Sequence, residues 1–151
     1  MTDYIVDIDG TVSDCEWRRQ KVLVNGSKNY DEFNSLHIAD KPIVPMRYLL
    51  EHLVQNRNNR FIIVTGRDES HRRTTEDWLK EYLPFLDYVG LLMRPEGNMD
   101  SDPDVKSVIL DQLIKAGFNP TVAIDDRLKV CRMWHRRGLY VICVNQGIVE
   151  Y

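Results

Sequence analysis

Short apolar runs alternate with longer amphipathic segments along the whole chain. The runs predict strands over residues 4–8, 60–65, 88–93, 121–125 and 139–144. Between them, apolar side chains recur three and four residues apart, which predicts helices over 45–56, 69–83, 102–117 and 127–138. This alternation is typical of an α/β fold, in which helices cover both faces of a parallel sheet. We therefore expect a central parallel sheet of about five strands, joined by right-handed crossovers.

Residues 12–44 break this alternation, because they separate the first strand from the first long helix. A crossover needs only a few connecting residues, so this segment is predicted to be an insertion that forms a small flap. Its "VLVNG" stretch at 22–26 is a candidate for half of a hairpin. Long insertions in compact domains are usually functional or disordered. The chain has no internal repeat or linker, so we expect one domain over 1–151.

The composition is that of a globular protein with a slight acidic excess. A net charge of −3 over 151 residues excludes a nucleic-acid-binding polycation, so any attraction for phosphate must be local. Cys15, Cys131 and Cys143 are odd in number and show no metal-binding spacing, which favours free thiols in a reducing cytoplasm. No signal peptide is recognisable, and no apolar run approaches the roughly 18 residues of a membrane span. We expect no contact with a membrane.

Polar residues gather where the predicted strands end. Asp7 and Asp9 follow the first strand, Thr65 ends the second, and Asp125 and Asp126 end the fourth. Ligands of parallel α/β sheets bind beyond the carboxyl ends of the strands, so these side chains should meet at one edge. Several converging carboxylates repel each other unless a cation lies between them, and Mg²⁺ prefers oxygen ligands. A magnesium site is therefore predicted there.

Each of these residues has a structural explanation when it is taken alone. Asp7 and Asp9 can form an Asx-type turn, Thr65 can belong to an ordinary strand-to-helix loop, and Asp126 can cap the next helix. A functional site is favoured because all of these residues are predicted to lie at the same edge of the sheet. Lys106 adds to it, because the helix dipole disfavours a cation near a helix start. Lys106 is either an exposed, tolerated lysine or a cation directed at a bound phosphate.

Four motifs in this order resemble those of the haloacid dehalogenase superfamily of phosphatases. They read "DIDGT", "VTGRD", "DPDVKSVIL" and "AIDDR", and they span nearly the whole chain. More specifically, "TGRDES" and "AIDDRLKVCRMWHRRGL" resemble the 3′-phosphatase domain of phage-type polynucleotide kinase-phosphatases. The resemblance implies a Rossmann-like three-layer sandwich with a minimal cap after the first strand. No G-x-x-x-x-G-K-[ST] sequence is present, so the kinase half of such enzymes has no counterpart here.

The resemblance also implies a chemistry for the motif residues. Asp7 would be the nucleophile that forms an aspartyl-phosphate, and Asp9 the general acid and then base. Thr65 would bind a phosphate oxygen, and Lys106 would offset phosphate charge and steady the nucleophile. The implied Mg²⁺ ligands are Asp7, the backbone carbonyl of Asp9, Asp125 and Asp126.

Basic residues near the predicted edge are candidates for substrate binding. Gly66, Arg67 and Arg127 directly adjoin the motifs, and Arg18 matches an arginine of the family that follows the first motif. Arg19, Arg72, Arg73 and Arg94 also lie near this edge, and for Arg72 and Arg73 a solvated helix face is an equally good explanation. Arg132, Arg136 and Arg137 lie farther along their helix and are predicted to be surface residues. Trp17 either stacks on a base or packs on the domain.

Three functions remain open from the sequence. The first is a polynucleotide 3′-phosphatase that acts on phosphorylated nucleic-acid ends, in a phage or bacterial repair setting that the family suggests. The second is a phosphatase of small molecules such as nucleoside monophosphates. The third is a phosphate-binding module without catalysis. The oligomeric state is not predicted.

Overall fold

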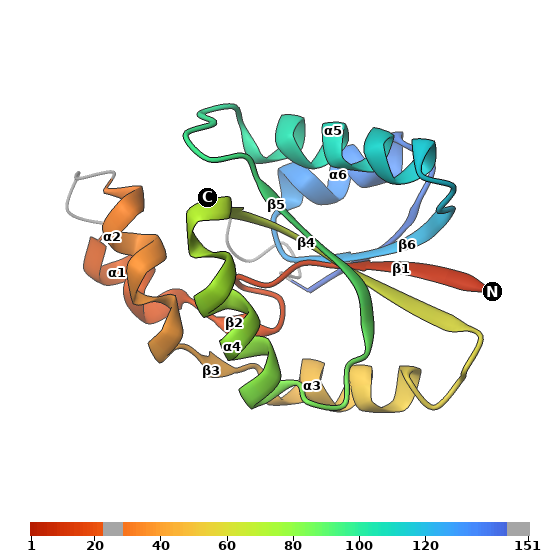
Figure 1. Cartoon of the computed structure of the whole chain (residues 1–151), viewed down its shortest axis with the longest axis horizontal. Helices are drawn as coiled ribbons and strands as arrows, with labels where there is room; N and C mark the ends of the chain where they lie inside the picture. Colours follow the sequence, from red (N-terminus) through yellow and green to blue (C-terminus); the bar gives the residue numbers. More distant parts are fainter. Residues whose placement is uncertain (23–28, 145–151) are drawn as a thin grey trace.

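A five-stranded parallel sheet forms the centre of the computed structural model, which describes residues 1–22 and 29–144 (Figure 1). Its strands are β1 (Thr2–Val6), β4 (Asn59–Asp68), β5 (Tyr88–Arg94), β6 (Pro120–Asp125) and β7 (Tyr140–Cys143). The helices that connect them are α3 (Val44–Leu53), α4 (Arg72–Tyr82), α5 (Asp102–Lys115) and α6 (Leu128–Arg136), with a 3₁₀ turn η2 (Glu69–His71) before α4. The strand order is β5-β4-β1-β6-β7, and each neighbouring pair is parallel.

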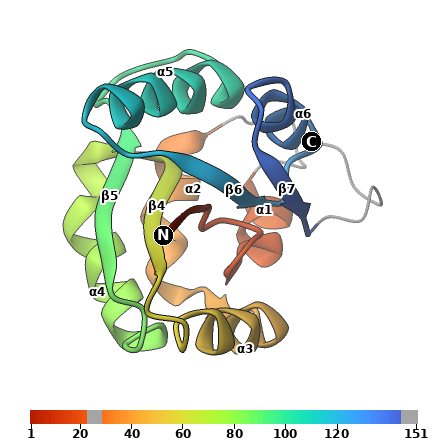
Figure 2. The same cartoon turned by 90° about the vertical axis from the view of Figure 1, so that its right-hand side faces the viewer.

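Helices cover both faces of the sheet, as the alternating pattern predicts (Figure 2). On one face, Leu50 of α3 and Trp78 of α4 pack against Val6 and Ile63 of the central strands. On the other face, residues of α5 and α6 pack against the alternate side chains of the same strands. This confirms the α/β fold with a three-layer, Rossmann-like arrangement.

The strand β4 is longer than its apolar run. The run predicts a strand that ends at Thr65, but pairing with β5 continues to Asp68, which lies opposite Arg94 after an irregularity in register. Pairing to β5 thus extends the strand through polar residues that do not resemble a strand in sequence. As a consequence Thr65, Gly66 and Arg67 lie within β4 rather than in a loop.

The insertion after β1 forms a small cap beyond the carboxyl ends of the strands, at the left of Figure 1. We use "the cap" for the described residues 13–22 and 29–42. It consists of β2 (Ser13–Asp14), α1 (Glu16–Val22), α2 (Tyr30–Ser35), the 3₁₀ turn η1 (Leu36–Ala39) and β3 (Lys41–Pro42). β2 and β3 pair in antiparallel fashion. Of the predicted half-hairpin at 22–26, Val22 belongs to α1, and the remainder lies outside the described residues.

None of the helices in 1–22 and 29–144 combines the length and the hydropathy that crossing a membrane requires.

Candidate active site

Three carboxylates meet at the carboxyl ends of β1 and β6. Asp7 directly follows β1, Asp125 ends β6, and Asp126 comes next. Each offers an oxygen within 4.8 Å of the other two, and all three residues are buried. The ends of neighbouring parallel strands place them together, as the sequence predicts. A set of three carboxylates is the kind of ligand group that a hard divalent cation such as Mg²⁺ prefers.

Lys106 enters this group from α5. Its Nζ lies 2.8 Å from Oδ1 of Asp7 and 2.7 Å from Oδ2 of Asp125, and the side chain is 2 % exposed. Burial alone would lower the pKa of Lys106, but the charges of Asp125 and Asp7 raise it above its usual value. Lys106 is therefore a charged lysine inside the site rather than a tolerated surface lysine.

Lys106 does not neutralise the whole group. Burial raises the pKa of Asp7 well above its usual range, Lys106 opposes this, and the charges of Asp125 and Asp126 add to it. Three carboxylates around one lysine retain an excess of negative charge, which a bound divalent cation would relieve. The residues present thus fit a magnesium ion.

Asp9 stands apart from the three carboxylates, because two arginines hold its side chain. Arg67 donates from Nη2 to Oδ1 at 2.6 Å and from Nε to Oδ2 at 3.0 Å, and Arg18 donates from Nη2 to Oδ1. Burial would raise the pKa of Asp9, but the two guanidinium charges hold it well below its usual range. Arg18 and Arg67 are fully buried. Both are predicted substrate ligands, yet here they contact a carboxylate of the protein.

Asp40 anchors this arrangement from the cap, and sequence reasoning does not single it out. Its carboxylate accepts hydrogen bonds from Ser13 Oγ at 2.5 Å, from Trp17 Nε1 at 2.8 Å and from Arg18 Nε at 2.9 Å. Its backbone carbonyl accepts one from Trp78 Nε1 of α4 at 3.0 Å. Asp40 is fully buried. Only the folded cap brings these donors together, so no sequence motif marks the residue.

Trp17 remains partly exposed, with 39 % of its surface accessible to solvent. The hydrogen bond to Asp40 fixes its indole, so it is packed on the cap as one of the two interpretations requires. Trp78 and Trp134 are buried in the core, and Trp134 Nε1 also donates to Oδ2 of Asp125 at 3.2 Å.

The turn after β1 requires a glycine. Gly10 has φ +82°, and a Cβ at this position would lie 2.2 Å from Oδ2 of Asp126. The next residue, Thr11, is buried and donates from its hydroxyl to Oδ2 of Asp7 at 3.0 Å. Sequence reasoning misses Thr11, although its place in "DIDGT" is the signal that could find it. The turn therefore positions the oxygens of Asp7 and leaves room for Asp126.

Thr65 and Gly66 lie in β4, just after the part of that strand that pairs with β1. Thr65 is buried, and its hydroxyl accepts from the backbone N–H of Arg67 at 3.2 Å. The carbonyl of Gly66 accepts from Nε of Arg94 at 3.0 Å, and a Cβ on Gly66 would lie 2.9 Å from Oδ1 of Asp102. The chain thus needs a small residue where β4 passes the start of α5.

Asp102 joins two arginines at the edge of the site. It accepts from Nη2 of Arg94 and from Nη1 of Arg127. Burial would raise the pKa of Asp102, but Arg127, Lys106 and Arg94 lower it. Arg127 is a predicted substrate ligand, and its side chain is 33 % exposed. From its sequence position Asp102 is only a helix-opening residue, so its pairing with Arg127 is new from the structure.

The other basic residues near the edge contribute less to the site. Arg19 pairs with Glu16, and Arg72 with Glu69, in each case three residues apart along the chain. Arg73 and Arg132 are exposed. Exposure favours a solvated helix face for Arg73, whereas Arg72 also donates from Nη2 to the backbone carbonyl of Leu91 in β5 at 3.0 Å.

His37 of η1 lies where the cap meets the body. Its Nδ1 pairs with the backbone carbonyl of Asn34, and its ring packs edge-on against His71 at 5.8 Å between centroids. Burial lowers the pKa of His37 to about 4, and the nearby Arg67 adds to this effect. The histidine is therefore neutral at physiological pH.

Known proteins share both the sequence and the fold of this chain. A family model described as the polynucleotide kinase PNKP phosphatase domain matches residues 2–148. A chain of a Pnkp1/Rnl/Hen1 RNA repair complex is 28 % identical over 95 % of this chain, with a TM-score of 0.75. This chain spans only 42–45 % of that protein.

Haloacid dehalogenase-type proteins share the fold at lower identity. One from Streptococcus pneumoniae is 16 % identical, with a TM-score of 0.67, over 99 % of this chain and 87 % of its own. Another, from Bacteroides thetaiotaomicron in complex with magnesium and inorganic phosphate, is 11 % identical, with a TM-score of 0.53, over 99 % of this chain and 96 % of its own.

Proposed function

Because this chain belongs to the family of polynucleotide kinase PNKP phosphatase domains and is a phosphatase of the haloacid dehalogenase type, we propose that it removes the 3′-phosphate from nucleic-acid ends in a Mg²⁺-dependent reaction. The observation that carries the chemistry is the pairing of Asp7 with Lys106 beside Asp125 and Asp126. Mg²⁺ would be held by carboxylate oxygens of Asp7, Asp125 and Asp126, together with the backbone carbonyl of Asp9.

Asp7 is the proposed nucleophile. Its Oδ1 accepts from Lys106 and its Oδ2 from Thr11, so the carboxylate has a fixed orientation before substrate arrives. Attack of one Asp7 oxygen on phosphorus gives an aspartyl-phosphate and releases the nucleic-acid alcohol; water then cleaves the acyl phosphate. When bound, Mg²⁺ supplies charge neutralisation and alignment of the phosphoryl group. Lys106 offsets phosphate charge, and Thr65 donates its hydroxyl hydrogen to a phosphate oxygen.

Asp9 is the proposed acid and base. Arg18 and Arg67 keep its carboxylate ionised at rest, so it must gain a proton before it can protonate the leaving alcohol. A bound phosphate dianion favours this, because a nearby negative charge raises the pKa of Asp9 and competes for the same guanidinium groups. After the alcohol leaves, the ionised Asp9 accepts a proton from the attacking water.

The family and the small size of the cap support the proposed substrate class. The matched protein of the RNA repair complex supports a nucleic-acid end as substrate. The cap is built from two short helices, a 3₁₀ turn and two short strands, and such a minimal cap suits a polymer end. Arg127, part of whose side chain is exposed, is a proposed contact for the nucleic-acid backbone, together with Gly66 of β4.

The setting that we propose is the cytoplasm. All three cysteines are free thiols, which is the usual state in a reducing compartment.

The decisive experiment compares phosphate release from several phosphomonoesters. Oligonucleotides of DNA and RNA with a 3′-phosphate are tested against nucleoside 3′- and 5′-monophosphates, each with MgCl₂ or with EDTA. We expect release from 3′-phosphorylated ends, lost in EDTA. Asp7→Asn should lower kcat by a factor on the order of 10⁴ or more, because it removes the nucleophile.

The matched control is Asp77→Asn, which changes an exposed aspartate of α4 and should leave the rate unchanged. Faster turnover of mononucleotides than of oligonucleotide ends would refute the polymer substrate. Equal rates for Asp7→Asn and the wild type would refute the mechanism.

A further inference from the structure

Two cysteine side chains converge behind the proposed metal site. Cys131 lies in α6 and Cys143 ends β7, and both lie against the main chain of Asp125, which Cys131 contacts through Sγ and which Cys143 faces across the pairing of β6 with β7. Both are free thiols. Strand geometry explains the approach, because alternate residues of β7 share a face. Val141 packs against the core cluster of α5 and α6, so Cys143, two residues later, faces α6 as well.

The thiols also surround the backbone of a proposed metal ligand. Sγ of Cys131 donates to the carbonyl oxygen of Asp125 at 3.4 Å. The same carbonyl accepts the backbone N–H of Val144 at 3.0 Å, and Cys143 is the residue of β7 that lies opposite Asp125. Any movement of the two sulfur atoms is therefore transmitted to the main chain of Asp125, whose side chain contacts Lys106 and Trp134.

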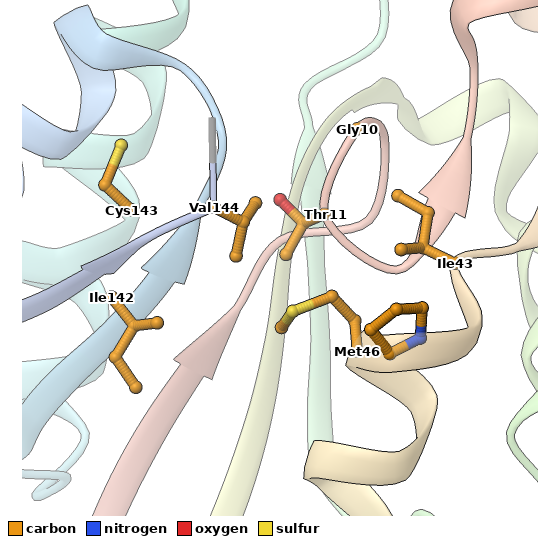
Figure 3. Close-up of a pocket in the computed structure, with 8 residues that line it drawn as sticks. Gly10, Thr11, Ile43, Met46, Ile142, Cys143 and Val144 are labelled. Carbon is orange, nitrogen blue, oxygen red and sulfur yellow. The ribbon is translucent and has the colours of Figure 1, made fainter. Parts of the chain in front are cut away.

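The two thiols differ in accessibility. Cys131 is buried, with 6 % of its surface exposed, whereas Cys143 is half-buried. Cys143 also lines a cavity of about 410 Å³, between the Gly10–Thr11 turn, the start of α3 and the end of β7 (Figure 3). In that view the sulfur of Cys143 points away from the side chain of Ile142, as alternation along a strand requires, so the difference in accessibility rests on the half-buried state of Cys143 and not on the cavity. A small solvent-borne oxidant can reach Cys143 before Cys131.

We propose that Cys131 and Cys143 form a reversible disulfide that weakens Mg²⁺ binding at Asp125. The oxidant is of the peroxide class. Cys143 and hydrogen peroxide give a sulfenic acid and water; the thiol of Cys131 then attacks this sulfur, forming the disulfide and releasing a second water. Two electrons pass from the two thiols to the peroxide. A dithiol reductant reverses the step.

Two consequences of disulfide formation would weaken Mg²⁺ binding. A disulfide holds its two sulfur atoms about 2.05 Å apart, so its formation would draw α6 and the end of β7 together. The S–H donor to the carbonyl of Asp125 is lost at the same time. Loss of contacts around metal ligands typically costs 10–100-fold in metal affinity, so we expect Mg²⁺ affinity to fall by about tenfold. This part rests on the proposed function, because it takes Asp125 as a metal ligand.

The test uses the full chain, reduced and then treated with hydrogen peroxide. Intact mass, peptide mapping and thiol counting follow the disulfide, and calorimetry with MgCl₂ follows metal binding without any phosphatase substrate. We expect the mass to fall by two hydrogen atoms, one peptide to link residues 131 and 143, and dithiothreitol to restore both thiols and Mg²⁺ affinity. Cys143→Ser should block all of these changes, and Cys15→Ser should block none.

Three results would overturn the proposal. They are oxygen added to Cys143 without a link to Cys131, a disulfide between two molecules, and a linked pair with unchanged Mg²⁺ affinity. Cys131→Ser and Cys131→Ala are both made, so that one poorly folded variant does not decide the outcome. Because mass and metal binding are measured directly, a chain that hydrolyses no phosphomonoester still tests the disulfide.

Discussion

Lys106→Met tests whether the lysine holds the proposed nucleophile in place. Methionine has a similar length and is apolar, so the change removes the charge and leaves most of the volume. In the wild type, Nζ lies 2.8 Å from Oδ1 of Asp7 and 2.7 Å from Oδ2 of Asp125, and all three residues are buried. The variant leaves two buried carboxylates without this partner.

The expected loss of unfolding free energy in Lys106→Met is large, because the carboxylates that remain have little access to water. Removing one partner of a buried ion pair typically costs about 3–5 kcal/mol. For a chain of 151 residues, each kcal/mol lowers Tm by about 2–4 °C, so Tm should fall by about 6–20 °C.

The loss of unfolding free energy in Lys106→Met should also increase with pH. The pKa of Asp7 is already raised in the folded wild type, and losing Lys106, which opposes that shift, raises it further. A carboxylate with a folded pKa above its unfolded pKa holds more protons when folded, so stability falls as pH rises through that interval. The deficit of Lys106→Met relative to the wild type should therefore be larger at pH 8 than at pH 5.

Urea denaturation in EDTA at pH 5, 6.5 and 8 measures this difference. The matched control is Lys115→Met, an exposed lysine in the last turn of the same helix, which should stay close to wild type. A deficit below about 1 kcal/mol at pH 8, or one that grows on acidification, would show that Lys106 does not compensate these carboxylates.

Three further changes test other parts of the site. Gly10→Ala should lower Mg²⁺ affinity, because its Cβ would meet Asp126. It should also lower the free energy of unfolding, by about 1–2 kcal/mol from the left-handed backbone alone. Calorimetry measures the affinity and urea denaturation the stability, and an unchanged affinity would contradict the close approach. The free energy of unfolding of His37→Gln should rise relative to that of the wild type by up to about 3 kcal/mol as pH falls from 7 to 4. The reason is that the folded pKa of His37 is about 4, so protonation of this histidine opposes folding below pH 6.5. Parallel profiles of unfolding free energy against pH for the two proteins would contradict this. Asp40→Asn should lower the free energy of unfolding by about 3–5 kcal/mol, because Arg18 then has one carboxylate fewer. The exposed Asp77→Asn is the control. Equal urea midpoints for the two variants would argue against Asp40 as the anchor of Arg18.

The layered fold and the meeting of Asp7, Asp125 and Lys106 could be predicted because local signals fix them. Apolar runs mark the strands, and parallel strands bring their carboxyl ends to one edge whatever the details of packing. The end of β4 could not be predicted in this way. Polar residues from Gly66 to Asp68 continue the strand only because β5 lies beside them, and that pairing is a tertiary contact.

The partners of the arginines could not be predicted either. The sequence places Arg18, Arg67 and Arg127 near the site, but a guanidinium group binds carboxylates and phosphates with the same geometry. In the structure Arg18 and Arg67 contact Asp9, and Arg127 contacts Asp102. For Arg18 the choice depends on where the cap folds, and for Arg67 and Arg127 it depends on contacts between elements far apart in the sequence, which no local pattern encodes.

The connection between Asp40, Arg18 and Asp9 limits how this protein can be altered by recombination. In a modular view, a cap is a specificity element that can be exchanged while the catalytic body stays intact. Here the cap supplies one of the two cations that set the protonation of the proposed acid, and Asp40 orients that cation. A chimera with a foreign cap would change the acid chemistry together with the substrate preference, unless the new cap carried an equivalent arginine and its carboxylate anchor.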